Sequence, residues 1–307
     1  MAGKNLKNRK TEIMRYYLRV FFVGMAMGVA NIIPGVSGGT LAVVFGIYEK
    51  LMDALGNFLT DRERRGEHIT FLAILFAGSL IAIVALAGLL KWAFNNYPLI
   101  TVYFFMGLIL GSIPVVLKVH KDMKPTFTRM AAFLTGLIFV IILALYQSHG
   151  NDGALITDFS GFGLADYFYF AFAGLIAASA MIIPGVSGSF ILILLGVYWT
   201  VLGALSGLLP LIMEQGLNDQ ALPRLIILGA LFVGVVAGIL GFSRIMDFLL
   251  KKFPAQTMYA ILGLIIGSLY QIYPGVEISL NGLLAFISLT LGFVISIKFS
   301  ADDSSSG

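Results

Sequence analysis

The sequence predicts an all-α integral membrane protein organised as an inverted-repeat transporter. Three observations lead to this prediction: an apolar composition, basic residues clustered on one side of the expected topology, and a P-G-V-S-G motif that occurs twice. Hydrophobic residues make up 59% of the 307 residues and charged residues 12%. A soluble domain carries about 25% charged residues, so this chain has too few polar side chains to cover a surface that faces water.

Composition also excludes several kinds of site. The chain has no cysteine, which rules out disulfides and thiolate metal sites, and we expect no catalytic centre, metal or cofactor. The formal net charge of +4 comes from basic residues beside apolar segments, which favours membrane orientation over nucleic-acid binding. The three histidines, His68, His120 and His149, lie in polar stretches, where we expect solvated loop side chains.

Ten apolar stretches follow one another along the chain, and most reach the roughly 20 residues that a transmembrane helix needs. They occupy residues 16–33, 38–59, 71–94, 98–117, 127–147, 166–183, 188–212, 225–250, 254–273 and 280–299. We assign the first two stretches to one hairpin and the sixth and seventh to another. The remaining stretches then predict about six full spans.

Basic residues set the expected orientation. With the N-terminus in the cytoplasm, all of the 20 Lys and Arg except Lys50, Lys91 and Arg224 fall on the cytoplasmic side, in agreement with the positive-inside rule. The same topology places the C-terminus in the cytoplasm as well.

The two halves of the chain are related in sequence. Residues 24–58 and 174–208 are identical at 13 of 35 aligned positions, including the run Ile-Ile-Pro-Gly-Val-Ser-Gly. A second block repeats with the glycine pairs Gly107/Gly111 and Gly263/Gly267, which we expect to be helix-packing faces. The expected organisation is a basic cytoplasmic N-terminus (1–15), a first repeat (16–147), an extracytoplasmic linker (148–165), a second repeat (166–299) and a disordered tail (300–307).

The topology predicts that the second repeat is inverted relative to the first. Three crossings separate the two hairpins, and an odd number of crossings means that the second hairpin starts on the opposite side of the membrane from the first. Inverted repeats are typical of secondary transporters, in which broken helices hold the substrate near the membrane midplane.

Each motif predicts a break between two helices. Pro34 and Pro184 lack a backbone donor and disfavour helix in the residue before them. We therefore expect one helix to end just before each proline and another to begin at about Gly38 and Gly188. The loops are uncharged and have apolar flanks, which favours re-entrant hairpins inside the membrane. Two full spans per hairpin give the same topology and stay open as an alternative, with the loops at opposite surfaces.

A helix that starts after a glycine-rich break presents unpaired N–H groups and the positive end of its dipole, a combination that binds phosphate. Serine and threonine hydroxyls add further donors. The predicted phosphate-binding residues are Asn31, Gly35, Ser37, Gly38, Gly39, Thr40, Gly185, Ser187, Gly188 and Ser189. The alternative is that the glycines only allow close helix packing.

Three charged residues in or beside the apolar stretches are further candidates. Glu49 is a candidate carrier of a coupling proton. Arg19 and Arg244 are candidates for binding a lipid phosphate from the cytoplasmic side or, equally, for setting orientation. Residues 35–39 also fit the G-x-S-x-G nucleophile elbow, but no histidine lies in an apolar segment to act as a base, so hydrolysis is disfavoured.

The motif reads Asn31-Ile-Ile-Pro-Gly-Val-Ser-Gly-Gly-Thr40 in the first repeat and Met181-Ile-Ile-Pro-Gly-Val-Ser-Gly-Ser189 in the second. This pair resembles the motifs of the bacterial polyprenyl-phosphate transporters of the PopT type, and the resemblance covers residues 20–299. It implies a protein of the bacterial cytoplasmic membrane, not an enzyme, that returns undecaprenyl phosphate from the outer to the inner leaflet for reuse in cell-envelope synthesis.

The partners expected from this resemblance are the polyprenyl-phosphate lipid and membrane lipids, with H+ or Na+ as candidate coupling ions. Two alternatives stay open. One is an ion-coupled secondary transporter of a small soluble anion, and the other is a membrane enzyme that acts on polyprenyl phosphates.

Overall fold

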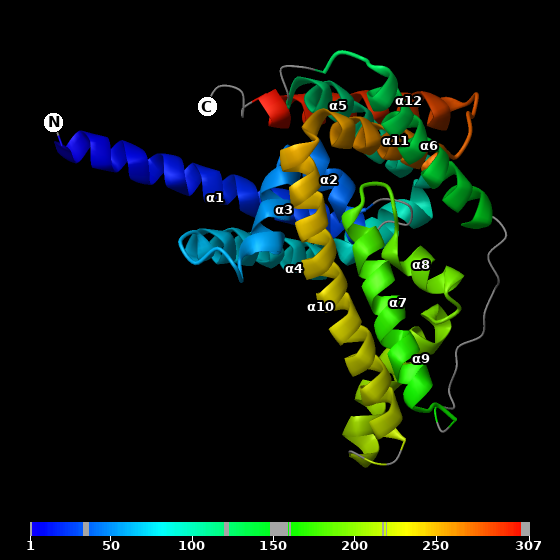
Figure 1. Ribbon diagram of the computed structural model, residues 1–307. Coiled ribbons are helices and arrows are strands. Elements are labelled where there is room, and N and C mark those ends of the chain that lie inside the picture. Colours follow the sequence, from blue (N-terminus) through cyan, green and yellow to red (C-terminus); the bar gives the residue numbers. More distant parts are fainter. Residues whose placement is uncertain are drawn as a thin grey trace.

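The computed structural model describes residues 2–32, 37–119, 123–147, 159, 161–216, 218 and 220–301. In this part of the chain the regular structure is helical throughout (Figure 1). The first six helices are α1 (Ala2–Ile32), α2 (Gly38–Val44), α3 (Tyr48–Asn57), α4 (Arg65–Asn96), α5 (Pro98–Val119) and α6 (Phe127–Gln147). The next six are α7 (Leu164–Ile182), α8 (Gly188–Leu194), α9 (Tyr198–Gln215), α10 (Ala221–Lys252), α11 (Pro254–Ile272) and α12 (Leu280–Ala301). The all-α prediction is confirmed.

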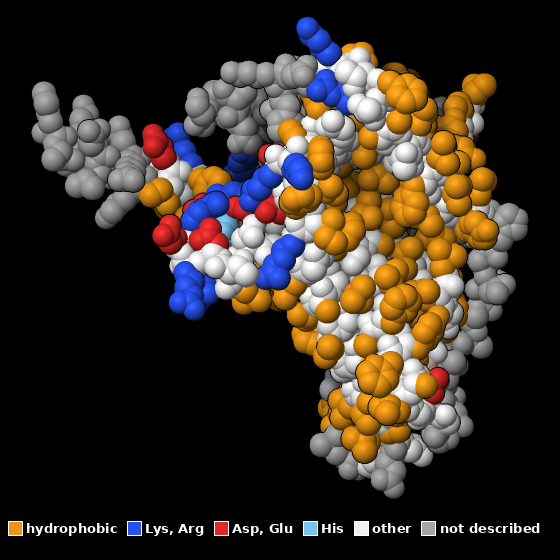
Figure 2. All heavy atoms as spheres, in the orientation of Figure 1, with side chains coloured by type: hydrophobic (Ala, Val, Ile, Leu, Met, Phe, Trp, Pro, Cys, Tyr) orange, Lys and Arg blue, Asp and Glu red, His pale blue; other side chains and the backbone are white. Residues whose placement is uncertain are grey.

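Seven of the described helices are long and apolar enough to cross a membrane, namely α1, α4, α6, α7, α10, α11 and α12, and α5 adds a shorter apolar segment. Large apolar side chains are exposed along them: Val84 on α4 is 77% exposed and Phe232 on α10 is 66% exposed. Hydrophobic side chains cover the surface of α7 and α10, whereas charged ones gather around the α3–α4 turn and the adjoining end of α10 (Figure 2). An apolar surface of this extent belongs in lipid, so the chain is a multi-pass membrane protein.

The helices end and restart at the motifs as the prolines predict. α1 ends at Ile32 and α2 begins at Gly38, and the corresponding break separates α7 from α8. Ile183 has φ −68° and ψ 122°, which is the extended conformation that a following proline favours. Residues 33–36 of the first motif lie outside the described residues.

Each hairpin contains a second break. The apolar stretches 38–59 and 188–212 predict one helix each, whereas the structure divides them into α2 and α3 and into α8 and α9. The division falls at Gly46 (φ 71°) and Gly196 (φ 70°), in the left-handed region that glycine favours. α8 and α9 are bent by 114° relative to each other. The signal in the sequence is a glycine at matching positions of the two repeats.

The two predicted repeats are interleaved. α1 packs along α4 and α7 packs along α10, so these two pairs each lie within one half of the chain (Figure 1). The pairs α5–α12 and α6–α11 are mixed, because each consists of one helix from each half. The expected glycine faces lie at these mixed crossings. A Cβ on Gly107 would collide with the backbone carbonyl of Leu289 on α12, and a Cβ on Gly263 would collide with that of Phe133 on α6. The predicted packing role of these glycines is confirmed.

Candidate functional site

The two P-G-V-S-G motifs meet through a backbone donor. The N–H of Gly185 in the second motif donates to the hydroxyl oxygen of Thr40 at 2.8 Å and to that of Ser37 at 3.2 Å. Ser37 and Thr40 are only 4% and 1% exposed, so the contact is shielded from solvent and lipid. The sequence predicts all three residues as phosphate-binding, Ser37 and Thr40 at the first motif and Gly185 at the second, and the structure brings the three together.

The first motif is shaped by a helix cap. Ser37 is extended (φ −107°, ψ 146°), and its Oγ accepts a hydrogen bond from the N–H of Thr40 at 3.1 Å. This N–H is one of the donors that the start of a helix leaves unsatisfied. The two hydroxyl oxygens are 2.9 Å apart and share a further hydrogen bond. The hydroxyls that the sequence predicts to bind phosphate are therefore occupied by protein partners in this state.

A second contact fixes the end of α7 to the first hairpin. The buried hydroxyl of Tyr48 donates to the carbonyl oxygen of Ile182 at 3.2 Å, which satisfies an acceptor that the end of a helix leaves open. Gly39 faces the same carbonyl, and a Cβ there would lie 2.8 Å from its oxygen. At Gly39, close helix packing therefore requires the glycine.

The second motif is more open than the first. Ser187 is the N-cap residue of α8 but makes no side-chain cap bond, and its hydroxyl pairs instead with that of Ser189 at 2.9 Å. Ser189 is exposed and Gly188 is half-buried, whereas Gly38 and Gly39 of the first motif are buried. The two predicted phosphate sites thus differ, because the one at α8 reaches the protein surface and the one at α2 does not.

The two arginine candidates bind backbone carbonyls at the ends of the first hairpin's helices. Nη2 of Arg19 donates to the carbonyl of Phe45, the C-cap residue of α2, at 3.2 Å. Nε of Arg244 donates to the carbonyl of Gly56 in the last turn of α3 at 2.7 Å. A cation at a helix C-terminus stabilises the helix dipole, so both side chains support the fold of this hairpin.

The remaining predicted site residues are not brought to the contact between the motifs. Glu49 is exposed in the first turn of α3. Asn31 belongs to the last turn of α1, but its side chain, like the whole of Gly35, lies outside the described residues.

A polar cluster that the sequence does not single out as a site joins α3 to α10. Nδ2 of Asn57 donates to Asp247 at 2.9 Å and to Asp53 at 3.0 Å. Nζ of Lys251 lies 2.8 Å from both carboxylates, and Arg64 lies 3.0 Å from Asp53. Burial disfavours a charge on Asp53, but the hydrogen bonds and positive charges outweigh burial and hold the pKa of Asp53 below its usual value.

This α3–α10 cluster has no equivalent in the second repeat. The positions that match Asp53 and Asn57 are Gly203 and Gly207 on α9. In the described part of the chain α3 packs closely along α10, whereas α9 makes no comparable contact with α4. The two repeats are therefore related in sequence but packed differently, because among the described residues only the first repeat places its third helix closely on a helix of the other repeat.

His68 corrects the expectation of a solvated histidine. Its side chain is 1% exposed, and Nε2 lies 3.9 Å from a carboxylate oxygen of Asp61. Neither ring nitrogen has a hydrogen-bond partner among the described residues. The physical reason is helical period: His68 starts the inward face of α4, which continues through Phe71, Leu72 and Leu75. His120 and His149 lie outside the described residues.

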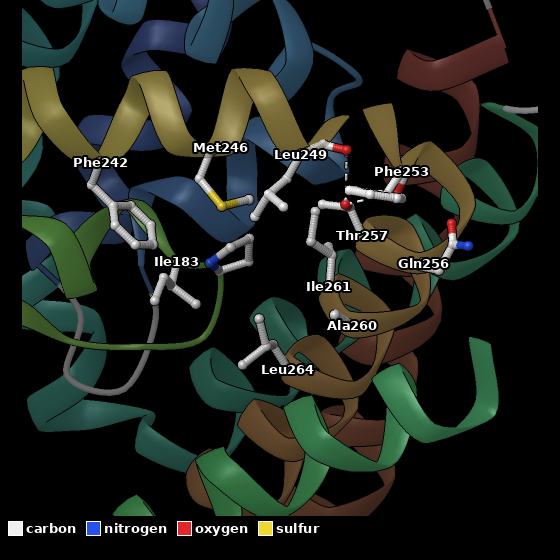
Figure 3. A pocket seen from close by; sticks show the side chains of 11 residues that line it. Ile183, Phe242, Met246, Leu249, Phe253, Gln256, Thr257, Ala260, Ile261 and Leu264 are labelled. Atoms are coloured by element: carbon white, nitrogen blue, oxygen red, sulfur yellow. Dashed lines mark hydrogen bonds between the residues drawn. The ribbon is translucent and has the colours of Figure 1, made fainter. Parts of the chain in front are cut away.

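An apolar groove adjoins the second motif (Figure 3). It has a volume of about 330 Å³ and is lined by Ile183 and Pro184 together with side chains of α10 and α11. No charged side chain lines it. The groove thus extends from the meeting point of the motifs along two membrane helices.

Comparison with known proteins identifies the family of the chain. The model of the VCA0040-like family, described as undecaprenyl phosphate translocase-like, matches residues 27–281. A polyprenyl-phosphate transporter of Vibrio cholerae serotype O1 is 33% identical in an alignment of 289 residues that covers 90% of this chain and 81% of that protein. A polyprenyl-phosphate transporter of Staphylococcus aureus is 32% identical in an alignment of 279 residues that covers 89% of this chain and 93% of that protein. No solved structure matches the chain. The chain belongs to the undecaprenyl phosphate translocase-like family.

Proposed function

We propose that this protein is a transporter that returns undecaprenyl phosphate, or another polyprenyl phosphate, from the outer to the inner leaflet of the bacterial cytoplasmic membrane. The two relatives named polyprenyl-phosphate transporters support the substrate, and the candidate spans support a polytopic protein. The observation that carries the proposal is the buried contact of Gly185 with Ser37 and Thr40, because hydrogen-bonding groups from both halves of the chain converge there.

The converging groups suit a phosphate headgroup. Backbone N–H groups and hydroxyls are donors that bind phosphate oxygens, and they act more strongly away from water. Ser187 and Ser189 are the accessible pair, so the headgroup binds there first in our mechanism. Gly185 is engaged with Ser37 and Thr40 in the described state. Separation of the two motifs then releases these three residues as the next donors on the path.

In our mechanism the headgroup crosses the membrane as the protein alternates between two conformations in which the inverted repeats swap their packing. In the described state α3 packs along α10 and is held there by the Asn57–Asp247 hydrogen bond. In the opposite state α9 packs along α4. The two re-entrant hairpins are residues 16–59 and 166–212, each with its P-G-V-S-G loop at the tip inside the membrane. With both termini in the cytoplasm, the α3–α10 cluster lies on the cytoplasmic side, so the described state is closed toward the cytoplasm. Glu49 is the candidate for binding a coupling H+ or Na+.

A lipid substrate is supported over a small soluble anion by the surroundings of the second motif. The groove beside Pro184 is apolar and open, which suits a hydrocarbon tail that stays in the membrane while the headgroup crosses. A soluble anion needs an enclosed aqueous cavity instead. The proposal involves no chemical step, so the protein acts as a carrier and not as an enzyme on polyprenyl phosphates.

Translocation of undecaprenyl phosphate in proteoliposomes tests the proposal. Replacing both serines of the accessible pair, Ser187→Ala with Ser189→Ala, is expected to slow translocation by at least about tenfold, because a hydrogen bond to a charged group contributes about 1.5–3 kcal/mol. Ser206→Ala is the matched control, since Ser206 is exposed on α9 and bonds only its own helix. An unchanged rate in the double variant, or transport of free phosphate in preference to the lipid, contradicts the proposal.

A further inference from the structure

The groove beside the second motif has a lining that selects for hydrocarbon. One wall is α10, with Phe242, Met246 and Leu249, and the other is α11, with Ile261 and Leu264 (Figure 3). No charged residue contributes to either wall, and the polar side chains of the lining are those of Gln256 and Thr257. A ligand held here gains from contact with apolar side chains and finds no ionic partner.

The threonine in the groove is not available as a donor. Oγ1 of Thr257 donates to the carbonyl of Phe253 at 2.8 Å and lies 3.2 Å from the carbonyl of Leu249 (Figure 3). Both carbonyls belong to the turn from α10 into α11, so the hydroxyl is used to hold this turn. The hydroxyl proton of Thr257 is therefore already engaged with the backbone.

The inner end of the groove lies at the proposed headgroup path. Pro184 lines the groove, and the next residue is Gly185, which bonds to Ser37 and Thr40. A lipid with its phosphate at the motifs places the first part of its tail at this end. The volume of about 330 Å³ is at the lower limit of ligand cavities, which span about 300–1,000 Å³, so the groove holds a segment of a tail and not the whole of it.

We propose that the groove between α10 and α11 binds the isoprene units next to the phosphate of the transported lipid, while the rest of the tail stays in the bilayer. This inference rests on the proposed function and adds a subsite to it. It makes the protein sensitive to the structure of the tail near the headgroup and insensitive to tail length beyond the groove.

A chain-length series of polyprenyl phosphates tests the subsite. Binding to the purified full chain is measured for lipids from dimethylallyl phosphate through geranylgeranyl phosphate to undecaprenyl phosphate. In the wild type, affinity is expected to rise with the first isoprene units and then to level off. Ala260→Phe, which fills the groove from α11, is expected to lower the affinity for undecaprenyl phosphate about tenfold. The loss is expected to be smaller for dimethylallyl phosphate, which places only one isoprene unit in the groove.

Ala237→Phe is the matched control, because Ala237 is exposed on α10 and does not line the groove. Met246→Asn is a second groove variant that places an amide among the apolar side chains without adding bulk, in case Ala260→Phe does not fold. It too is expected to flatten the chain-length dependence. Equal effects of Ala260→Phe and Ala237→Phe, or wild-type affinity that does not depend on chain length, overturn the inference.

The outcomes separate this inference from the proposed function. If the wild type binds and translocates undecaprenyl phosphate but both groove variants keep the wild-type length dependence, only the subsite is wrong. If the wild type neither binds nor translocates any polyprenyl phosphate, the proposed function fails, and the subsite fails with it.

Discussion

Thr40 and Gly185 are joined by a hydrogen bond of 2.8 Å from the backbone N–H of Gly185 to the hydroxyl oxygen of Thr40. The two residues belong to the two copies of one motif, so this bond ties the halves of the chain together at the place where the sequence predicts phosphate binding. In the proposed transport cycle this hydrogen bond holds the motifs together in the described state and breaks when the motifs separate.

Thr40→Val is expected to weaken this tie. Valine has the shape of threonine without the hydroxyl, so the N–H of Gly185 keeps only the longer bond to Ser37. The loss of one buried hydrogen bond costs about 0.5–1.5 kcal/mol, and we expect a lower apparent Tm of the detergent-solubilised protein. Thr290→Val is the control, because Thr290 is exposed on α12 and bonds the carbonyl of Phe286. An equal Tm for both variants would show that the tie contributes nothing to stability.

Gly185→Ala is expected to be more harmful than Gly196→Ala. Both glycines have positive φ, 83° and 70°, and alanine in the left-handed region costs about 1–2 kcal/mol. At Gly185 a Cβ would also lie 2.8 Å from the carbonyl oxygen of Leu264, whereas nothing lies within 4 Å at Gly196. Apparent Tm and translocation rate should both fall further for Gly185→Ala. The reverse order would mean that the backbone of the second motif differs from the described one.

The α3–α10 cluster is expected to hold the cytoplasmic side closed. Asp247→Ala removes the carboxylate that both Asn57 and Lys251 contact. The chain has no cysteine, so Met52→Cys on α3, where Met52 is 1% exposed, reports opening by maleimide labelling. We expect faster labelling of Met52→Cys when Asp247→Ala is added.

The control for this measurement is Glu63→Ala, which removes an exposed carboxylate near the same surface. Glu63→Ala should leave the labelling rate of Met52→Cys unchanged. If Asp247→Ala also leaves it unchanged, the cluster does not control the packing of α3 on α10.

His68→Leu is expected to be neutral or stabilising. The imidazole is buried with neither nitrogen hydrogen-bonded to a described residue, and an unsatisfied buried polar group costs about 1–3 kcal/mol. Leucine keeps the apolar face of α4 without this cost. An unchanged or higher Tm supports this account, and a fall of Tm as large as that of Thr40→Val would reveal a bond to His68 that the described residues do not contain.

Local chemistry made much of the fold predictable. Pro34 and Pro184 mark where helices end, and the glycine pairs at Gly107 and Gly263 mark where helices cross, because these residue types act on the backbone directly. The break at Gly46 and its equivalent was missed, since an apolar run with one glycine also fits a continuous helix.

The sequence singled out Ser37, Thr40 and Gly185 as phosphate-binding candidates, but it did not predict that they bind one another. Ser37, Thr40 and Gly185 bind one another in the described state, whereas the motif alone predicts open donors. The α3–α10 cluster was out of reach because it depends on how α3 packs on a helix of the other repeat, and short-range patterns such as helical period do not contain that information.

In the proposed mechanism the lipid headgroup binds between the two motifs. The most direct measurement is an experimental structure of the full chain with bound undecaprenyl phosphate. We expect phosphate oxygens within hydrogen-bonding distance of Ser187 and Ser189, with the first isoprene units in the groove beside Pro184. A phosphate bound elsewhere on the protein surface, with no contact to either motif, would contradict it.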